Sequence, residues 1–151
     1  MPDYNLIIKQ TAGFIETDPW YVPLFSNVSA LLMNSIPDLN WAGFYIMRRG
    51  RLVVGPFQGK PACIHIEVGR GVCGTAVSLD AVQLVPDVHA FPGHIACDSA
   101  SRSEIVIPLR VRDQVAAVLD VDSPLPARFG EAEREGLEAV VRMLERHIRM
   151  E

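Results

Sequence analysis

The hydrophobic pattern predicts amphipathic helices near both ends of the chain. Apolar residues recur at three- and four-residue intervals from Val22 to Ile36, and Pro37 ends that pattern. A second apolar stripe runs from about Gly130 to Met150, with acidic residues near its start and basic residues near its end, as the helix dipole favours. Residues 1 to 18 predict only a short helix, because the apolar run is brief and Gly13 interrupts it.

Between these helices the pattern changes to that of an antiparallel sheet. Leu39 to Met47 is apolar and aromatic with little alternation, which is typical of a strand covered on both faces. A turn at residues 48 to 50 and a second apolar run from Arg51 to Phe57 predict a hairpin. Glu104 to Leu109 and Val115 to Val121 predict another pair of strands, and the second of these is apolar on both sides and therefore central.

Two pairs of side chains on these strands are candidates for a functional site. Asp120 and Asp122 are two residues apart, so their carboxylates point to the same face, about 7 Å apart along the strand. Desolvation and mutual repulsion would raise the pKa of at least one, which suits proton donation or the binding of an ammonium group. A solvated strand end is the alternative, more reasonable for Asp122. Trp41 and Tyr45 are four apart and share a face, either as core aromatics or as a pocket wall.

All three cysteines lie in one loop-rich stretch, residues 59 to 103. They are Cys63, Cys73 and Cys97. Clustered thiols indicate redox chemistry or metal binding. The spacings of ten and twenty-four residues lack the short paired-cysteine clamp of most structural zinc sites, so redox chemistry is favoured over a zinc site completed by a nearby histidine.

Residues 69 to 74 match the glycine pattern of dinucleotide-binding loops, but the surrounding βαβ unit is missing and we exclude a Rossmann domain. The glycines still permit close backbone approach before a helix predicted over Thr75 to Leu79. Amides at such a helix start attract an anion such as a carboxylate. They would also lower the pKa of Cys73 if that residue lies in the first turn.

A long polar loop follows a short strand predicted at Gln83 to Val85. Residues 87 to 103 contain proline, glycine and three serines, so we expect this segment to lie outside the core as a lid or ligand-binding loop. Cys97 lies within it, close in sequence to His94 and Arg102, which would stabilise a thiolate. An inert buried cysteine is the alternative.

Composition narrows the classes of partner. A chain of 151 residues suffices for one domain with its own core. The net charge of -4 argues against nucleic acid, which requires a basic surface, and favours small molecules or proteins. The N-terminal residues lack the features of a signal peptide, and no apolar run is long enough to span a membrane. We therefore expect a cytoplasmic protein without a membrane or nucleic-acid partner, in which unoxidised thiols are the default.

Five motifs carry a resemblance to a known family. They are NWAGFY at 40–45, GPFQGKPAC at 55–63, GVCGTA at 71–76, VPDVHAFPGHIACDSASRSEIVIPL at 85–109 and VLDVDSP at 118–124. Together they resemble the free methionine-(R)-sulfoxide reductases, a single-domain branch of the GAF fold. The resemblance implies an α+β fold over residues 1–151, with a central antiparallel sheet of about six strands and helices packed on its faces, and commonly a homodimer.

The resemblance also implies an activity, the reduction of free methionine (R)-sulfoxide to methionine, with no cofactor and no metal. A thiolate attacks the sulfoxide sulfur, an acid protonates the departing oxygen, and a second cysteine converts the resulting sulfenic acid to a disulfide that thioredoxin reduces. By motif match Cys97 is the nucleophile. Cys63 is the favoured resolving cysteine, with Cys73 as the alternative or a relay.

The same resemblance assigns the substrate-binding residues. Glu104, Asp120 and Asp122 match family acids that hold the substrate or assist proton transfer, and Trp41 matches the aromatic residue beside the substrate's methyl group. Tyr45 joins Trp41 in the expected pocket wall. A GAF domain that only binds a small ligand as a sensory module, without catalysis, is the alternative function.

Overall fold

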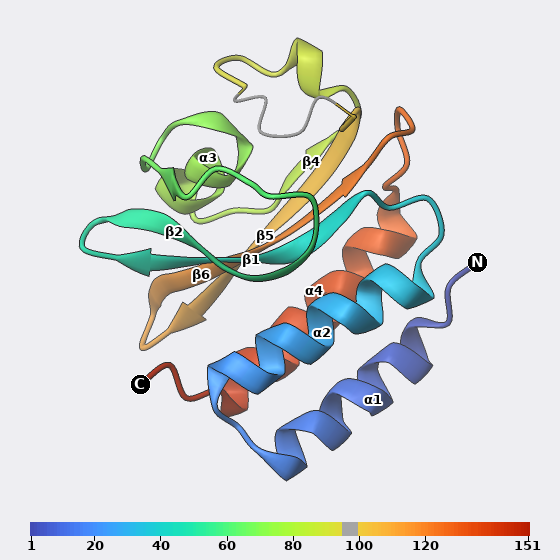
Figure 1. Ribbon diagram of the computed structural model, residues 1–151, viewed down its shortest axis with the longest axis vertical. Coiled ribbons are helices and arrows are strands. Elements are labelled where there is room, and N and C mark those ends of the chain that lie inside the picture. The colour runs from blue at the N-terminus through green and yellow to red at the C-terminus, as the bar shows by residue number, and fades with distance from the viewer. Residues whose placement is uncertain (95–99) are drawn as a thin grey trace.

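The computed structural model describes residues 1–94 and 100–151 (Figure 1). Its helices are α1 (Tyr4–Thr17), α2 (Tyr21–Ser35), α3 (Gly71–Leu79) and α4 (Glu131–His147), with a short 3-10 helix η1 (Val88–Ala90). Its strands are β1 (Trp41–Arg48), β2 (Arg51–Gly59), β3 (His65–Ile66), β4 (Gln83–Val85), β5 (Ser103–Val111) and β6 (Gln114–Ser123). None of the helices in these two ranges has the length and hydropathy needed to cross a membrane.

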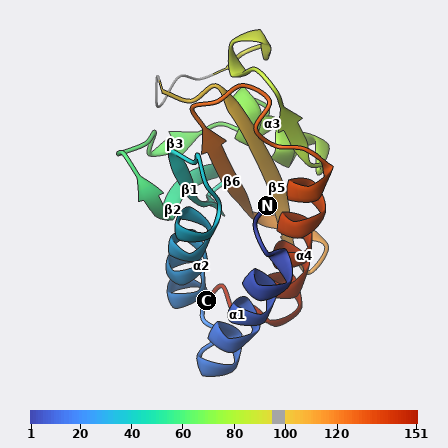
Figure 2. The same cartoon turned by 90° about the vertical axis from the view of Figure 1, so that its right-hand side faces the viewer.

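The strands form one antiparallel sheet in the order β3-β2-β1-β6-β5-β4. Helices α2 and α4 cover one face of the sheet, and α1 packs on both of them (Figures 1 and 2). Helix α3 covers the other face, against β3, β4, β5 and β6. This arrangement confirms the expected α+β fold of six antiparallel strands with helices on both faces, and it places β6 at the centre as predicted.

Both predicted hairpins form, and their turns explain why. Arg49 and Gly50 have φ angles of 53° and 81°, and Arg112 and Asp113 have φ angles of 55° and 62°. Two consecutive residues with positive φ make a turn whose twist matches that of the flanking strands. Each tight turn sets the register of its hairpin, β1 with β2 and β5 with β6.

The face under α2 and α4 is a continuous apolar core. Phe25 of α2 stacks on Phe44 of β1 with ring centroids 3.9 Å apart. Leu119 and Val121 of β6 are fully buried in the same cluster. Removing this much apolar surface from water is the main stabilising contribution to the fold.

Helix α1 is longer than the sequence predicts. It runs from Tyr4 to Thr17 straight through Gly13, and the Asp3 side chain caps it by accepting a hydrogen bond from the Leu6 amide at 3.1 Å. Ile7 is buried against the neighbouring helices. These contacts outweigh the cost of about 1 kcal/mol of a glycine in a helix interior, so the expected interruption was wrong.

The α3 face also differs from expectation at two points. Helix α3 starts at Gly71, four residues earlier than predicted, because Gly74 lets the helix approach the preceding loop. A Cβ at Gly74 would lie 2.4 Å from the carbonyl oxygen of Glu67. The segment from 87 to 103 was expected outside the core, yet Val88 is fully buried and Ser103 begins β5. Val88 packs with the apolar cluster under α3, which a count of polar residues cannot reveal.

Candidate active site

A pocket opens on the α3 face, where the first residues of β1 and β5 meet the last residues of β6. Strand register brings these ends together, because Trp41 pairs with Asp122 and Asp122 pairs with Glu104. The N-terminus of α3 forms another wall, with Gly71 and Cys73 lining the pocket. Residues from four distant parts of the sequence therefore surround one cavity.

Three buried carboxyl groups form the floor of this pocket. Glu104, Asp120 and Asp122 are only 7 %, 5 % and 8 % exposed, and all three line the cavity. Asp120 and Asp122 project to the same face of β6, as their spacing predicts, while burial excludes the solvated alternative for Asp122. Glu104 and Asp120 are hydrogen-bonded to each other.

Burial changes the protonation of this floor. The pKa of Glu104 is raised well above its ordinary value, first by desolvation and then by the charge of Asp120. The pKa of Asp120 is also raised well above its ordinary value, by desolvation and by Asp122. Protons therefore stay on this cluster at pH values where exposed carboxyl groups have lost them. The sequence expectation that at least one of these pKa values rises is confirmed.

Cys73 lies against the same carboxyl groups, and its pKa moves opposite to the sequence expectation. It occupies the first turn of α3, the position from which a helix start was expected to lower the pKa. The thiol is instead 4 % exposed, and desolvation, Asp120 and Glu104 raise its pKa well above the ordinary value. Burial and negative neighbours outweigh the helix terminus, so Cys73 is a thiol and not a thiolate.

Two aromatic rings line the pocket beside the carboxyl groups, because Trp41 of β1 pairs with Asp122 of β6. Trp41 and Tyr45 line the pocket with ring centroids 5.7 Å apart, and Trp41 also stacks on Phe57 at 5.0 Å. The indole Nε1 of Trp41 donates a hydrogen bond to the Lys60 carbonyl oxygen at 3.1 Å, which fixes the ring's orientation. Burial, together with Asp120, raises the pKa of Tyr45, so its phenol keeps its proton. Both interpretations left open by the sequence hold, because the two residues are 2 % exposed within an apolar cluster and also line the pocket.

The other two cysteines differ in what the structure shows. Cys63 follows β2, is half-buried and is disulfide-bonded, whereas Cys73 is a free thiol. Ala62, the residue before Cys63, lines the pocket. Cys97, the predicted nucleophile, lies outside the described residues.

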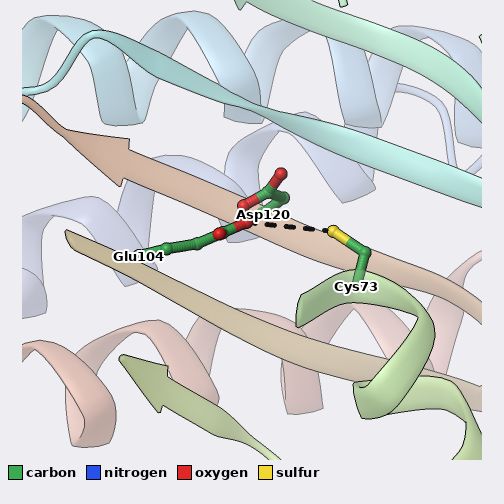
Figure 3. A group of neighbouring side chains, drawn as sticks. All are labelled: Cys73, Glu104 and Asp120. Atoms are coloured by element: carbon green, nitrogen blue, oxygen red, sulfur yellow. Dashed lines mark hydrogen bonds between the residues drawn. The ribbon is translucent and has the colours of Figure 1, made fainter. Parts of the chain in front are cut away.

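One group of metal-ligating residue types gathers in the described ranges. Single side-chain atoms of Cys73, Glu104 and Asp120 lie within 4.8 Å of one another (Figure 3). The pKa values of all three groups are raised, so protons compete with a metal ion for these atoms. The expectation that the protein uses no metal and no cofactor stays a prediction.

Sequence reasoning missed two polar residues of the pocket. Arg70 lies at the rim as the N-cap of α3, and Ser101 lies near the floor, where its hydroxyl accepts a hydrogen bond from the Asn40 side chain at 3.0 Å. The position of Arg70 inside the glycine-rich motif was an available signal. Ser101 had none, because the path of its loop depends on tertiary contacts. His94, which was considered for its sequence proximity to Cys97 and as a possible zinc ligand, also lines the pocket.

Comparison with known proteins places this fold and pocket in a family. The GAF domain family model matches residues 21–148, so the chain belongs to the GAF domain family. It is 49 % identical over 144 residues to the free methionine-R-sulfoxide reductase of Escherichia coli (strain K12), a match that covers 95 % of this chain and 83 % of that protein. Within the GAF family the chain belongs to the free methionine-R-sulfoxide reductases, which confirms the resemblance of its five motifs.

Two solved structures have the same fold over almost their whole length. The reduced form of the fRMsr of Staphylococcus aureus superposes with a TM-score of 0.95 at 47 % identity, covering 99 % of this chain and 97 % of that one. The free methionine-R-sulfoxide reductase of Neisseria meningitidis, in complex with its substrate, superposes with a TM-score of 0.92 at 38 % identity, covering 95 % and 87 %.

Proposed function

We propose that this protein reduces free methionine (R)-sulfoxide to methionine with cysteine thiols, in the pocket on the α3 face. Its family makes it an oxidoreductase. The observation that carries the proposal is the set of three buried carboxyl groups beside two aromatic rings in one pocket. Such a pocket offers a proton to the sulfoxide oxygen and an apolar surface to the substrate's methyl and thioether groups.

The reaction balances with the residues of this chain. The Cys97 thiolate attacks the sulfoxide sulfur, a buried carboxylic acid protonates the sulfoxide oxygen, and the sulfur–oxygen bond breaks. The oxygen passes to the Cys97 sulfur, and the transient bond between the Cys97 sulfur and the substrate sulfur breaks, so that Cys97 is left as a sulfenic acid and methionine leaves. Cys63 then attacks the sulfenic sulfur, releasing water and forming a disulfide. A dithiol reductant, which we take to be thioredoxin, reduces this disulfide and is itself oxidised.

The carboxyl floor suits the role of proton donor because of its raised pKa values. At neutral pH an exposed carboxyl group is almost fully ionised and has no proton to give. Burial of Glu104 and Asp120 keeps a proton between them. We assign the donor to this hydrogen-bonded pair.

The charges around the pocket match a free amino acid. The substrate's ammonium group would meet Asp120 or Asp122 on the floor, and its carboxylate would meet the Gly71 to Cys73 amides and Arg70 at the start of α3. A peptide bond at either end would remove one of those charges. The pocket would therefore favour free over protein-bound methionine sulfoxide.

The states of the cysteines support Cys63 as the resolving residue. Cys63 is disulfide-bonded, while Cys73 is a buried free thiol. Both facts favour a disulfide between Cys63 and Cys97 over one that involves Cys73. Homodimer formation stays an expectation from the resemblance, and a cytoplasmic location stays an expectation from the sequence.

Cysteine variants test the catalytic proposal. Purified protein should reduce the R epimer of free methionine sulfoxide, and not the S epimer, with thioredoxin or dithiothreitol. Cys97→Ser should abolish methionine formation even in a single turnover. Cys63→Ser should keep the single turnover and lose repeated turnover with thioredoxin. Product formation by Cys97→Ser would refute the nucleophile assignment, and ligand binding without any turnover in the wild type would favour a sensory module.

Aspartate variants test substrate recognition. Asp120→Asn and Asp122→Asn should raise KM for the free amino acid, because each removes a negative charge near the ammonium group. Unchanged KM values in both variants would refute the ammonium assignment.

A further inference from the structure

The proposed reaction leaves the buried thiol of Cys73 without a role. Cys73 lies in the first turn of α3, and its Sγ donates a hydrogen bond to Oε2 of Glu104 across 4.0 Å. Figure 3 shows this thiol pointing toward the carboxyl groups of Glu104 and Asp120. It therefore contacts the pair of groups to which we assign the reaction's proton.

The start of α3 holds this thiol in place. The Gly74 amide donates to the Arg70 carbonyl oxygen at 3.1 Å, and the Gly69 amide donates to the Gly74 carbonyl oxygen at 2.9 Å. Gly74 packs so tightly on Glu67 that a Cβ there would lie 2.4 Å from the Glu67 carbonyl oxygen. Disulfide exchange needs an accessible thiolate, and an anchored, buried thiol is poorly suited to it.

What remains for such a thiol is hydrogen bonding. The titratable groups around it are Tyr45 of β1, Glu104 of β5, Asp120 and Asp122 of β6, and Arg70 and His94 in the pocket lining. Of these, the Glu104 and Asp120 carboxyl groups accept from the thiol. A donor stabilises the ionised form of its acceptor and so lowers the acceptor's pKa, against the effect of burial. The thiol thereby makes the buried acid stronger than burial alone would leave it.

We propose that Cys73 is a positioning residue and not a resolving cysteine: its S–H group orients the Glu104 and Asp120 carboxyl groups and keeps their shared proton acidic enough to transfer. The inference rests on the proposed function, because it assigns the thiol to the acid of that reaction. No bond to the Cys73 sulfur forms or breaks, and the sulfur stays reduced through the cycle.

Two variants at this position separate hydrogen bonding from disulfide chemistry. Cys73→Ala should slow single-turnover methionine formation by about tenfold with KM changed by less than about twofold, because the donor acts on the proton transfer. The high-pH limb of its rate profile should move up by about half to one pH unit, since the acid has lost a group that stabilised its anion. Cys73→Ser supplies a hydroxyl donor and should restore both the rate and the pH profile.

Other outcomes overturn the inference. A Cys73→Ala rate and pH profile equal to wild type would show that the thiol does not act on the acid. Normal single turnover with lost thioredoxin turnover in both variants would make Cys73 a resolving cysteine. If the wild type reduces no methionine sulfoxide, the proposed function fails first. Infrared titration of the carboxyl bands then still tests the inference, because Cys73→Ala should raise the titration midpoint and Cys73→Ser should not, and equal midpoints would refute it.

Discussion

The two faces of the central sheet differ in whether they bury charged side chains, and strand β6 contributes to both. Leu119 and Val121 point into the apolar core under α2 and α4, whereas Asp120 and Asp122 point into the pocket under α3. All four are buried. The residues of β6 on the helical face, under α2 and α4, therefore contribute only apolar packing, whereas the α3 face combines a second apolar cluster with acids whose burial is unfavourable. Alternate residues of one strand contribute separately to stability and to chemistry.

Truncating a large side chain on the helical face gives the largest effect on stability. Phe44→Ala removes the partner of the Phe25 ring and leaves a cavity in a fully buried site. We expect the free energy of unfolding to fall by about 3–5 kcal/mol. Urea denaturation followed by circular dichroism measures this loss.

A milder change at the same position serves as the control for Phe44→Ala. Phe44→Leu should lose less stability because most of the volume remains. In both variants the molecules that stay folded should keep near-normal kcat/KM. A stability loss below about 1 kcal/mol in Phe44→Ala would contradict the assignment of this face as an apolar core that stabilises the fold.

The next largest expected effect is on kcat/KM, and it comes from comparing variants of two equally buried glutamates. Glu104 on the α3 face and Glu133 in the helical layer are each 7 % exposed. Glu104→Gln removes a member of the proton-holding pair, and we expect kcat/KM to fall by about a hundredfold with little change in stability. Steady-state kinetics and urea denaturation of the same preparation check both parts.

Glu133→Gln is the matched control. Glu133 accepts from the Gly130 amide at 2.8 Å and lies 3.9 Å from the Arg128 guanidinium, so it caps and anchors α4. We expect this variant to lose about 1–2 kcal/mol of stability and to keep its kcat/KM. An activity loss of similar size in both variants would break the proposed division between the two faces.

The buried carboxyl groups of the α3 face should change how the stability of the protein depends on pH. Glu104 and Asp120 have raised pKa values in the folded state, so above about pH 4 the folded protein binds more protons than the unfolded chain. Stability attributable to these groups therefore falls as pH rises from the ordinary pKa toward the folded one, by at most about 1.4 kcal/mol per pH unit for each proton.

Comparison with a variant that lacks both of these carboxyl groups isolates their contribution to the pH dependence of stability. The double variant Glu104→Gln, Asp120→Asn cannot ionise at these positions, so its stability should fall less than that of wild type between about pH 5 and about pH 8. Urea denaturation across this range gives both curves. Parallel curves would mean that the two carboxyl groups titrate normally in the folded protein.

The sequence predicted features that depend on local pattern. The two hairpins follow from turn residues and apolar runs, and the shared face of Asp120 and Asp122 follows from the two-residue period of a strand. The motifs carried the family and hence the fold. Periodicity and motif spacing thus sufficed for the scaffold and for most of the pocket's residues.

Features that depend on burial could not be predicted from the sequence. The pKa of Cys73 was expected to fall at a helix start, but three carboxyl groups from β5 and β6 surround it and raise it instead. Val88 belongs to the core although its neighbours in sequence are polar. In each case contacts distant in sequence outweighed local pattern.

The smallest expected effect concerns the outer helix, where the sequence expectation of an interruption at Gly13 was wrong. No atom lies within 4 Å of a Cβ placed on Gly13, and its φ is not positive, so an alanine fits the helix without strain. Gly13→Ala should therefore raise the free energy of unfolding by about 0.5–1 kcal/mol, because alanine loses less conformational entropy on folding. Thermal and urea denaturation measure this gain, and kcat/KM should stay unchanged because α1 lies across the helical layer from the pocket. A loss of stability would mean that Gly13 relieves a constraint in α1 that the open space around it does not reveal.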